Sequence, residues 1–215
     1  MFNATIGARA FRFETAPSLF SPNGLDAGTA AMLARAALKP GDKVLDLGCG
    51  YGPVGVYAAT IAEPASVWLV DVDPLAVELA ARNLRLNDVE GATALVSDGF
   101  EALSETGFTA ILCNPPYHVD FSVPRRLIEK AFNRLTIGGR LIMVTKRGAW
   151  YRNMLTGLFG GTRVWRDAGY YVFEAEKRSS AYANAARRWT PAPAPHRPQA
   201  CGARLLGGRM RPRSW

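Results

Sequence analysis

The chain has 215 residues, of which 48% are hydrophobic and three are cysteine, and its formal net charge is +8. This length fits one large domain with its own core. Three cysteines exclude a disulfide framework and favour a reducing, cytoplasmic setting, and no stretch approaches the length and apolarity of a membrane span.

The positive charge lies at the C-terminal end. Residues 178–215 hold eight of the 26 Lys and Arg and no Asp or Glu, which leaves 18 basic and 18 acidic side chains in residues 1–177. The 178–215 segment is rich in Pro, Gly and Arg and has no apolar periodicity, so we expect a disordered basic tail behind a single domain at 1–177. Either the tail adds non-specific affinity for nucleic acid, or it is an extension without such a role.

Strand and helix patterns alternate along the domain. Residues 11–15 predict a short strand before a loop rich in Pro, Ser and Gly. Apolar runs then predict strands at 43–47, 66–71, 92–97, 108–113, 139–145 and 170–176, and helical patterns predict helices at 29–38, 53–62, 74–86, 124–136 and 149–159. Such alternation is typical of a doubly wound, mainly parallel α/β sheet.

The strand at 43–47 runs into the sequence DLGCGYG, which starts at Asp46 and includes Gly48, Gly50 and Gly52. Glycines permit a tight turn from strand to helix and close approach of a ligand to the backbone. The next strand ends in Asp71, where a carboxylate can bind a ribose diol. These features predict a nucleoside-containing cofactor.

Two cofactors fit a glycine loop of this kind. Gly50, Gly52 and Gly55 also satisfy the GxGxxG spacing that brings a dinucleotide pyrophosphate to a helix N-terminus. However, the Asp46 carboxylate would repel a pyrophosphate and would attract the ammonium end of S-adenosylmethionine (SAM). Asp46 therefore favours SAM over NAD.

The strand at 108–113 ends in Asn114, Pro115, Pro116 and Tyr117. Two adjacent prolines cannot continue a central strand, because both lack the N–H donor and have a fixed φ. They can hold carbonyl oxygens outward beside the Asn amide and the Tyr ring. Two acceptors and an aromatic face suit a flat group that carries an amine, although an ordinary turn at a strand end is the simpler alternative.

Taken together, these motifs resemble class I SAM-dependent methyltransferases of the "methyltransferase small" family, which includes ribosomal RNA guanine-N2 methyltransferases. The resemblance covers residues 11–177, and Asp120 stands where the family usually has glycine. The matching segments are 21–29, 44–55, 70–73, 76–77, 83–84 with Asn87, 97–99 and 114–118.

The resemblance implies a Rossmann-like, seven-stranded sheet in the order 3-2-1-4-5-7-6 with the last strand antiparallel. It also implies SAM as the cofactor and ribosomal RNA or a ribosomal subunit as the partner. The residues that we assign to the cofactor are Thr29, Asp46, Gly48, Gly50, Gly52, Asp71, Val72 and Asp98, and those that we assign to catalysis are Asn114, Pro115 and Tyr117.

An exocyclic amine of guanine is a poor nucleophile, because its lone pair is delocalised into the ring. The Asn114 amide oxygen and the Pro115 carbonyl can accept its two hydrogens and turn the lone pair toward the methyl donor, while Tyr117 stacks on the base. No metal is required, and the two histidines, His118 and His196, do not make a metal site. His118 either takes the departing proton or is an ordinary loop residue.

Other residues have more than one interpretation. We expect Phe100 in the core, Asp73 as a helix cap, and Cys49 and Cys113 as packing residues. The cations that either flank the site or cover a solvated helix face are Arg125, Arg126, Lys130, Arg134, Lys146, Arg147 and Arg152.

The favoured function is SAM-dependent methylation of guanine N2 in small-subunit (16S) ribosomal RNA. The enzymatic alternatives are methylation of a protein glutamine amide or of adenine N6, because the Asn-Pro-Pro-Tyr motif suits any planar amine. The alternative of another class is a non-catalytic SAM- and RNA-binding module.

Overall fold

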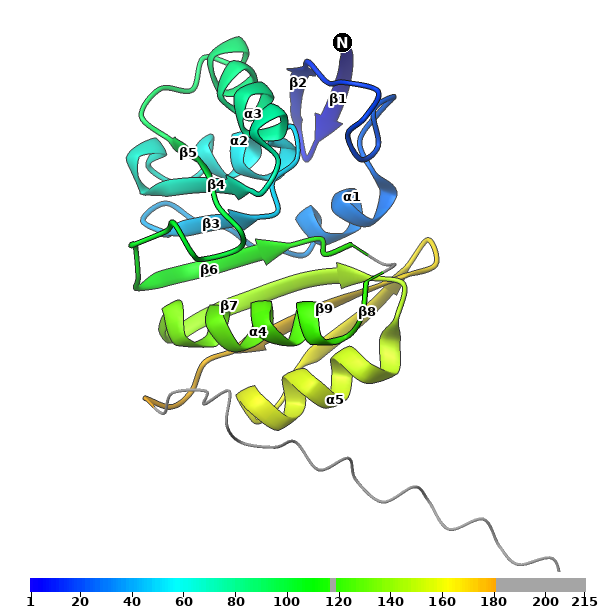
Figure 1. Cartoon of the computed structure of the whole chain (residues 1–215), viewed down its shortest axis with the longest axis vertical. Helices are drawn as coiled ribbons and strands as arrows, with labels where there is room; N and C mark the ends of the chain where they lie inside the picture. Colours follow the sequence, from blue (N-terminus) through cyan, green and yellow to red (C-terminus); the bar gives the residue numbers. More distant parts are fainter. Residues whose placement is uncertain (117–118, 181–215) are drawn as a thin grey trace, which may run out of the picture.

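The computed structural model describes residues 1–116 and 119–180, which form a central sheet, a separate hairpin and five α-helices (Figure 1). The strands are β1 (Phe2–Ile6), β2 (Arg9–Phe13), β3 (Val44–Leu47), β4 (Val67–Asp71), β5 (Thr93–Val96), β6 (Phe108–Cys113), β7 (Leu135–Thr145), β8 (Arg163–Asp167) and β9 (Tyr170–Glu176). The helices are α1 (Ala27–Leu33), α2 (Pro53–Ala59), α3 (Pro74–Leu86), α4 (Ser122–Arg134) and α5 (Gly148–Phe159), with a 3-10 turn at Pro64–Ser66.

The central sheet has seven strands in the order β5-β4-β3-β6-β7-β9-β8. Strands β5, β4, β3, β6 and β7 are mutually parallel, and β9 pairs antiparallel with both β7 and β8. Counted from β3, this is the order 3-2-1-4-5-7-6 that the resemblance implied. Strand order reverses between β3 and β6, so a crevice opens at the carboxyl ends of these strands.

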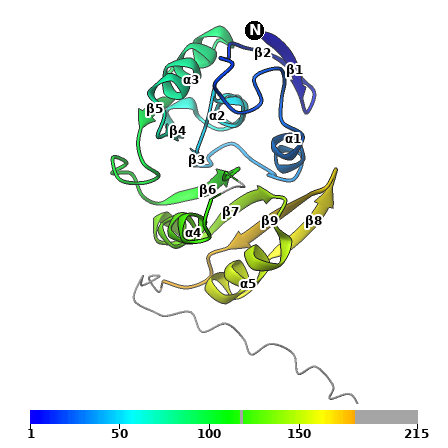
Figure 2. The same ribbon diagram turned by 45° about the vertical axis from the view of Figure 1, so that its right-hand side comes forward.

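Helices cover both faces of the sheet (Figures 1 and 2). One apolar cluster joins the β1–β2 hairpin and helices α1, α2 and α3 to one face, and a second joins α4 and α5 to the other. All four residues of β3 are buried because helices pack on both sides of it. None of the helices in the described ranges is long and apolar enough to cross a membrane.

Several predicted bounds were wrong. Helix α1 is Ala27–Leu33 rather than 29–38, since Asp26 accepts the Thr29 N–H and starts the helix earlier, and Ala37 has φ +40°, outside the helical region. Helix α2 ends at Ala59 rather than 62. Helix α4 covers Ser122–Arg134 rather than 124–136, because the chain enters β7 at Leu135.

The sequence patterns also missed strands. β7 was predicted too short: it starts at Leu135 rather than 139, because Thr136, Ile137 and Gly138 are exposed and interrupt the buried apolar pattern. Strand β8 carries charged, exposed side chains at the edge of the sheet, and only its pairing with β9 reveals it. Strand β1 was likewise overlooked, and its partner β2 is Arg9–Phe13 rather than 11–15.

Candidate active site

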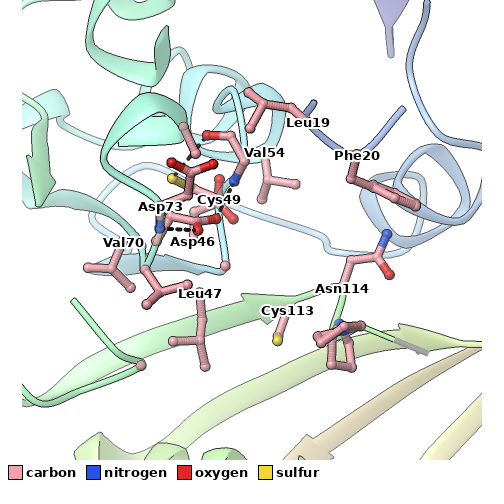
Figure 3. A pocket seen from close by; sticks show the side chains of 18 of the residues that line it. Leu19, Phe20, Asp46, Leu47, Cys49, Val54, Val70, Asp73, Cys113 and Asn114 are labelled. Carbon is pink, nitrogen blue, oxygen red and sulfur yellow. Dashed lines mark hydrogen bonds between the residues drawn. The ribbon is translucent and has the colours of Figure 1, made fainter. Parts of the chain in front are cut away.

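A cavity of about 650 Å³ lies at the carboxyl ends of β3, β4, β5 and β6 (Figure 3). Its size is that of a small-molecule site, and its position is the crevice at the strand reversal. Figure 3 shows Asp46 and Asp73 on one side of this cavity and Asn114 on the other. The cavity therefore joins the two sequence motifs, which come from strands that are neighbours in the sheet but about 65 residues apart in the chain.

The predicted glycine loop forms one wall of the cavity. Gly48, Gly50 and Gly52 all have positive φ, and Gly52 is the N-cap of α2, with Pro53 in its first turn. The backbone N–H groups of Gly48 and Cys49 both donate to the Val70 carbonyl at 2.9 Å. The loop is thereby tied to β4, and it brings backbone to the surface of the cavity.

Gly55 fixes how closely α2 approaches the sheet. A Cβ at this position would overlap the side chain of Leu69 on β4. The Gly55 N–H donates to the Asp46 carboxylate at 2.8 Å. The third glycine of the GxGxxG spacing thus serves helix–strand packing and holds a carboxylate.

Asp46 is a buried carboxyl at the edge of the cavity, with 2% of its surface exposed. Burial raises its pKa to about 7, the Gly55 N–H opposes this shift, and the nearby Asp71 adds to it. The predicted carboxylate beside the glycine loop is therefore present, and its ionisation lies close to neutral pH.

Asp71 closes β4 and lies against the glycine loop. One carboxylate oxygen accepts the Gly50 N–H at 2.8 Å, and the other accepts the Asp73 N–H at 3.0 Å. Val72, which follows, is 65% exposed and lines the cavity. Asp73 accepts the Leu75 N–H at 2.9 Å and caps α3, as predicted.

Asp98 also lines the cavity, but it has a partner that the sequence did not indicate. Its carboxylate accepts from the Arg126 guanidinium of α4 at 3.0 and 3.1 Å. This ion pair links the loop after β5 to α4, and both of its residues line the cavity. The assignment of Asp98 to the cofactor stays a prediction, whereas Phe100 is in the core, at 2% exposure, as expected.

Asn114 lies at the end of β6 and faces α1. Its Nδ2 donates to the Asp26 carboxylate at 3.1 Å and to the Thr29 hydroxyl at 3.0 Å. Asp26 is held in turn by the Thr29 N–H at 2.8 Å and by the Tyr170 hydroxyl at 3.2 Å. Because these acceptors fix the nitrogen side of the amide, they also fix the direction of its oxygen.

This network changes the interpretation of Thr29 and reveals Asp26. Thr29, assigned from the sequence to the cofactor, lines the cavity and also accepts the Asn114 amide. Asp26 had no assigned role, and the only local signal was an acidic residue three positions before Thr29, the spacing of a helix cap. Its contact with Asn114 joins residues 88 positions apart.

The two prolines after Asn114 both line the cavity, with Pro115 buried and Pro116 exposed. Tyr117, the third predicted catalytic residue, and His118 lie outside the described residues. Sequence reasoning also missed Phe20, which is 58% exposed and borders the cavity from the loop before α1. No periodicity marks that loop. Cys49 and Cys113 are buried, as expected of packing residues.

Known proteins are similar to this chain in sequence. The model of the methyltransferase small domain matches residues 10–174. Ribosomal RNA small subunit methyltransferase C of Pseudomonas putida is 31% identical over 166 residues, which are 75% of this chain and 49% of that protein. Ribosomal RNA large subunit methyltransferase G of Alteromonas mediterranea is 33% identical over 172 residues, which are 75% of this chain and 42% of that protein.

A solved structure is also similar. The 16S rRNA N2 methyltransferase of T. thermophilus, in complex with AdoMet and guanosine, has a TM-score of 0.75 and 32% identity, and the match covers 82% of this chain and 50% of that one. The chain thus spans about half the length of these relatives. One cavity of this chain is lined by the glycine loop, the acidic strand ends and Asn114. The chain belongs to the methyltransferase small domain family.

Proposed function

We propose that this chain is a SAM-dependent methyltransferase that modifies the exocyclic N2 amine of guanine in ribosomal RNA, with 16S RNA favoured, and that it acts in the cytoplasm. The observation that carries the proposal is the orientation of Asn114. Its amide nitrogen donates to Asp26 and Thr29, so its amide oxygen points away from these two residues. An amide oxygen can accept a hydrogen bond from the N–H of an amine, whereas an amide NH2 is itself a donor and cannot accept one.

The residues around the cavity fit SAM. The glycine loop offers close backbone approach, Asp71 suits a ribose diol, Val72 offers an apolar contact, and Asp46 suits a cation. When bound, SAM supplies an electrophilic methyl group on a sulfonium sulfur. Two carboxyl groups near this end of the cavity favour a cationic ligand and disfavour the pyrophosphate of a dinucleotide.

The residues at the other end fit the target. The Asn114 Oδ1 and the Pro115 carbonyl would accept the two hydrogens of the amine and direct its lone pair toward the cofactor end. The rigid proline backbone and the Asp26–Thr29 network hold these acceptors before the substrate arrives, so little reorganisation is needed. Stacking of the base on Tyr117 stays part of the proposal.

Two alternatives use the same site. Adenine N6 or a glutamine amide would present a similar flat amine to Asn114, and a non-catalytic module would bind SAM without using it. The relatives above 30% identity are named as ribosomal RNA methyltransferases of the small and the large subunit, which supports RNA over protein. The AdoMet and guanosine named for the T. thermophilus structure support guanine.

The test is transfer of labelled methyl from SAM to total RNA, isolated ribosomal subunits and a protein extract, followed by nucleoside and amino-acid analysis. We expect the label in N2-methylguanosine from small-subunit RNA. Label in N6-methyladenosine or in methylglutamine would replace this proposal with one of its enzymatic alternatives. SAM binding without transfer to any of these substrates would favour the non-catalytic module.

A further inference from the structure

Three side chains form a stack beside the target end of the cavity, at the first turns of α4 and α5. The rings of Phe121 and Trp150 are stacked, with centroids 4.5 Å apart and an interplanar angle of 19°. The Arg147 guanidinium carbon lies over the Phe121 ring, 4.8 Å from its centroid. We call Arg147, Phe121 and Trp150 the Arg147 stack.

The stack lies next to the residues proposed to hold the target amine. Cys113 of β6 pairs with Met143 of β7, so the chain leaves β6 at Asn114 close to the point where β7 ends at Thr145. An Arg147 Nη donates to the Val119 carbonyl at 3.3 Å, which ties the stack to the chain just beyond the Asn-Pro-Pro-Tyr motif. In Figures 1 and 2 the first turns of α4 and α5 lie at the carboxyl ends of β6 and β7.

Ion pairing distinguishes Arg147 from two of the cations of α4. Arg126 is paired with Asp98, and Lys130 is paired with Glu101, so these two side chains are neutralised within the protein. Arg147 is exposed, and within residues 1–116 and 119–180 no carboxylate lies within ion-pair distance of it. The neighbouring Asp120 instead accepts the Ser122 N–H at 2.8 Å.

An exposed arginine held in place by aromatic stacking is suited to an anion with several oxygen acceptors. Stacking fixes the guanidinium plane, so less side-chain entropy is lost when its N–H groups bind a ligand, and a phosphate can accept two of them at once. The α5 N-terminus begins at the next residue and adds positive potential. Lys146 directly precedes Arg147, and its ammonium nitrogen lies 5.1 Å from the Tyr170 ring centroid.

We propose that the Arg147 stack binds a backbone phosphate of the single-stranded RNA that flanks the target nucleotide. The inference rests on the proposed function, because it takes RNA as the substrate. A phosphate held here would place the strand across the ends of β6 and β7 and direct the target base to Asn114. A single strand fits better than a duplex, because the amine must reach the cavity and a paired base is confined within its helix.

The test measures binding of a fluorescent single-stranded RNA of mixed sequence to the full chain over a range of salt concentrations. Arg147→Ala should weaken binding about tenfold, the loss of a charged hydrogen bond, and should lower the slope of log K against log [salt] by about 0.7, the value for one phosphate on a single strand. Arg147→Lys keeps the charge, so the slope should be retained while affinity falls. Phe121→Leu should weaken binding, because the guanidinium loses its support.

Arg82→Ala is the matched control. Arg82 is also an exposed arginine, but it is on α3 and paired with Glu78 at 2.5 Å, so its removal should leave RNA affinity and the salt slope close to those of the wild type. Melting temperature and SAM affinity are measured for every variant to show that the fold is intact. If Phe121→Leu unfolds the protein, Arg147→Ala and Arg147→Lys decide the question.

The outcomes separate this inference from the proposed function. If the wild type methylates RNA but Arg147→Ala binds RNA with unchanged affinity and slope, the inference is overturned and the function stands. If RNA binding falls as expected but labelled methyl enters only protein, the surface is supported and the proposed function fails. If the wild type does not bind single-stranded RNA, or if the substitution impairs only methylation of a protein, the inference is overturned.

Discussion

At the scale of single residues, Asn114 shows how a side chain's role depends on its neighbours. An amide has a donor side and an acceptor side, and only the acceptor side helps to hold an amine. Asp26 and Thr29 select that side, because both present oxygen atoms to the Asn114 Nδ2. The catalytic role proposed for Asn114 thus depends on a helix cap in another part of the chain.

Asn114→Ala should lower the rate of methyl transfer about 10²- to 10³-fold, the effect of removing one preorganised polar group from a transition-state site. SAM affinity should change little, because Asn114 is assigned to the target amine. The measurement is single-turnover transfer to the RNA substrate, with calorimetry for SAM. Near-normal turnover would mean that Asn114 is only a turn residue.

Thr29→Val separates the two roles of Thr29. Valine keeps the shape and removes the hydroxyl that accepts the Asn114 amide, so kcat should fall about 5- to 10-fold, the value of one neutral hydrogen bond, with unchanged SAM affinity. Weaker SAM binding at constant kcat would instead assign Thr29 to the cofactor, as the sequence suggested.

The pKa of Asp46 predicts a pH dependence of cofactor binding. Burial raises this pKa to about 7, so the carboxyl of the ligand-free protein becomes protonated as the pH falls through this value. A cationic cofactor needs the ionised form, and binding below pH 7 must therefore release a proton. SAM affinity should fall by up to tenfold per pH unit below pH 7, as measured by calorimetry at pH 6, 7 and 8.

Asp46→Asn is the control for this pH dependence. The variant should bind SAM more weakly at pH 8 and should lose the dependence between pH 6 and 8. Because the raised pKa lies above that of the unfolded chain, folding free energy from Asp46 is lost as the pH rises through about 7, and Asp46→Asn should be the more thermostable protein at pH 8. A SAM affinity that does not vary with pH in the wild type would show that Asp46 is not coupled to the cofactor.

At the scale of secondary-structure elements, the contact between α2 and β4 positions the glycine loop. Gly55→Ala would force its methyl group into the Leu69 side chain, which should lower the free energy of unfolding by about 1–3 kcal/mol and weaken SAM binding as the loop shifts. Gly157→Ala in α5 is the matched substitution, since a Cβ there has no neighbour within 4 Å. It should stabilise the protein by about 0.5–1 kcal/mol through helix propensity. Thermal denaturation of both variants tests the pair, and an unperturbed Gly55→Ala protein would contradict the tight contact.

At the scale of the whole molecule, the charge is divided unevenly. Residues 1–177 carry balanced charge, and removal of residues 181–215 takes away seven arginines and no carboxylate. Both apolar clusters of the described domain lie within residues 1–180, so this truncation should leave the melting temperature and SAM affinity unchanged. If the segment binds RNA non-specifically, its removal should also lower RNA affinity and make the salt dependence shallower. A lower melting temperature after truncation would show that the segment contributes to the fold, contrary to its composition.

Features that are local in the chain could be predicted from the sequence alone. The apolar runs located β3, β4, β6 and β9. The glycines with Asp46 and the proline pair after Asn114 located two motifs that line one cavity, and their assignment to cofactor and target stays a prediction. Each of these signals depends on a few consecutive residues and on the rule that ligands bind where parallel strands end. The strand order came from the family resemblance, because periodicity gives no information on which strands pair.

Contacts between distant segments could not be predicted from the sequence and became visible in the folded chain. Three contacts join residues that no local pattern connects: the pairing of β8 with β9, the Asp98–Arg126 ion pair and the hydrogen bond from Asn114 to Asp26. The physical reason is that the direction of a side chain and its partner depend on how whole elements pack, and that packing is set by both apolar clusters together. For the same reason the sequence left open whether seven cations flank the site or cover a solvated helix face. The fold distinguishes Arg126 and Lys130, which are paired with carboxylates, from Arg147 in its aromatic stack.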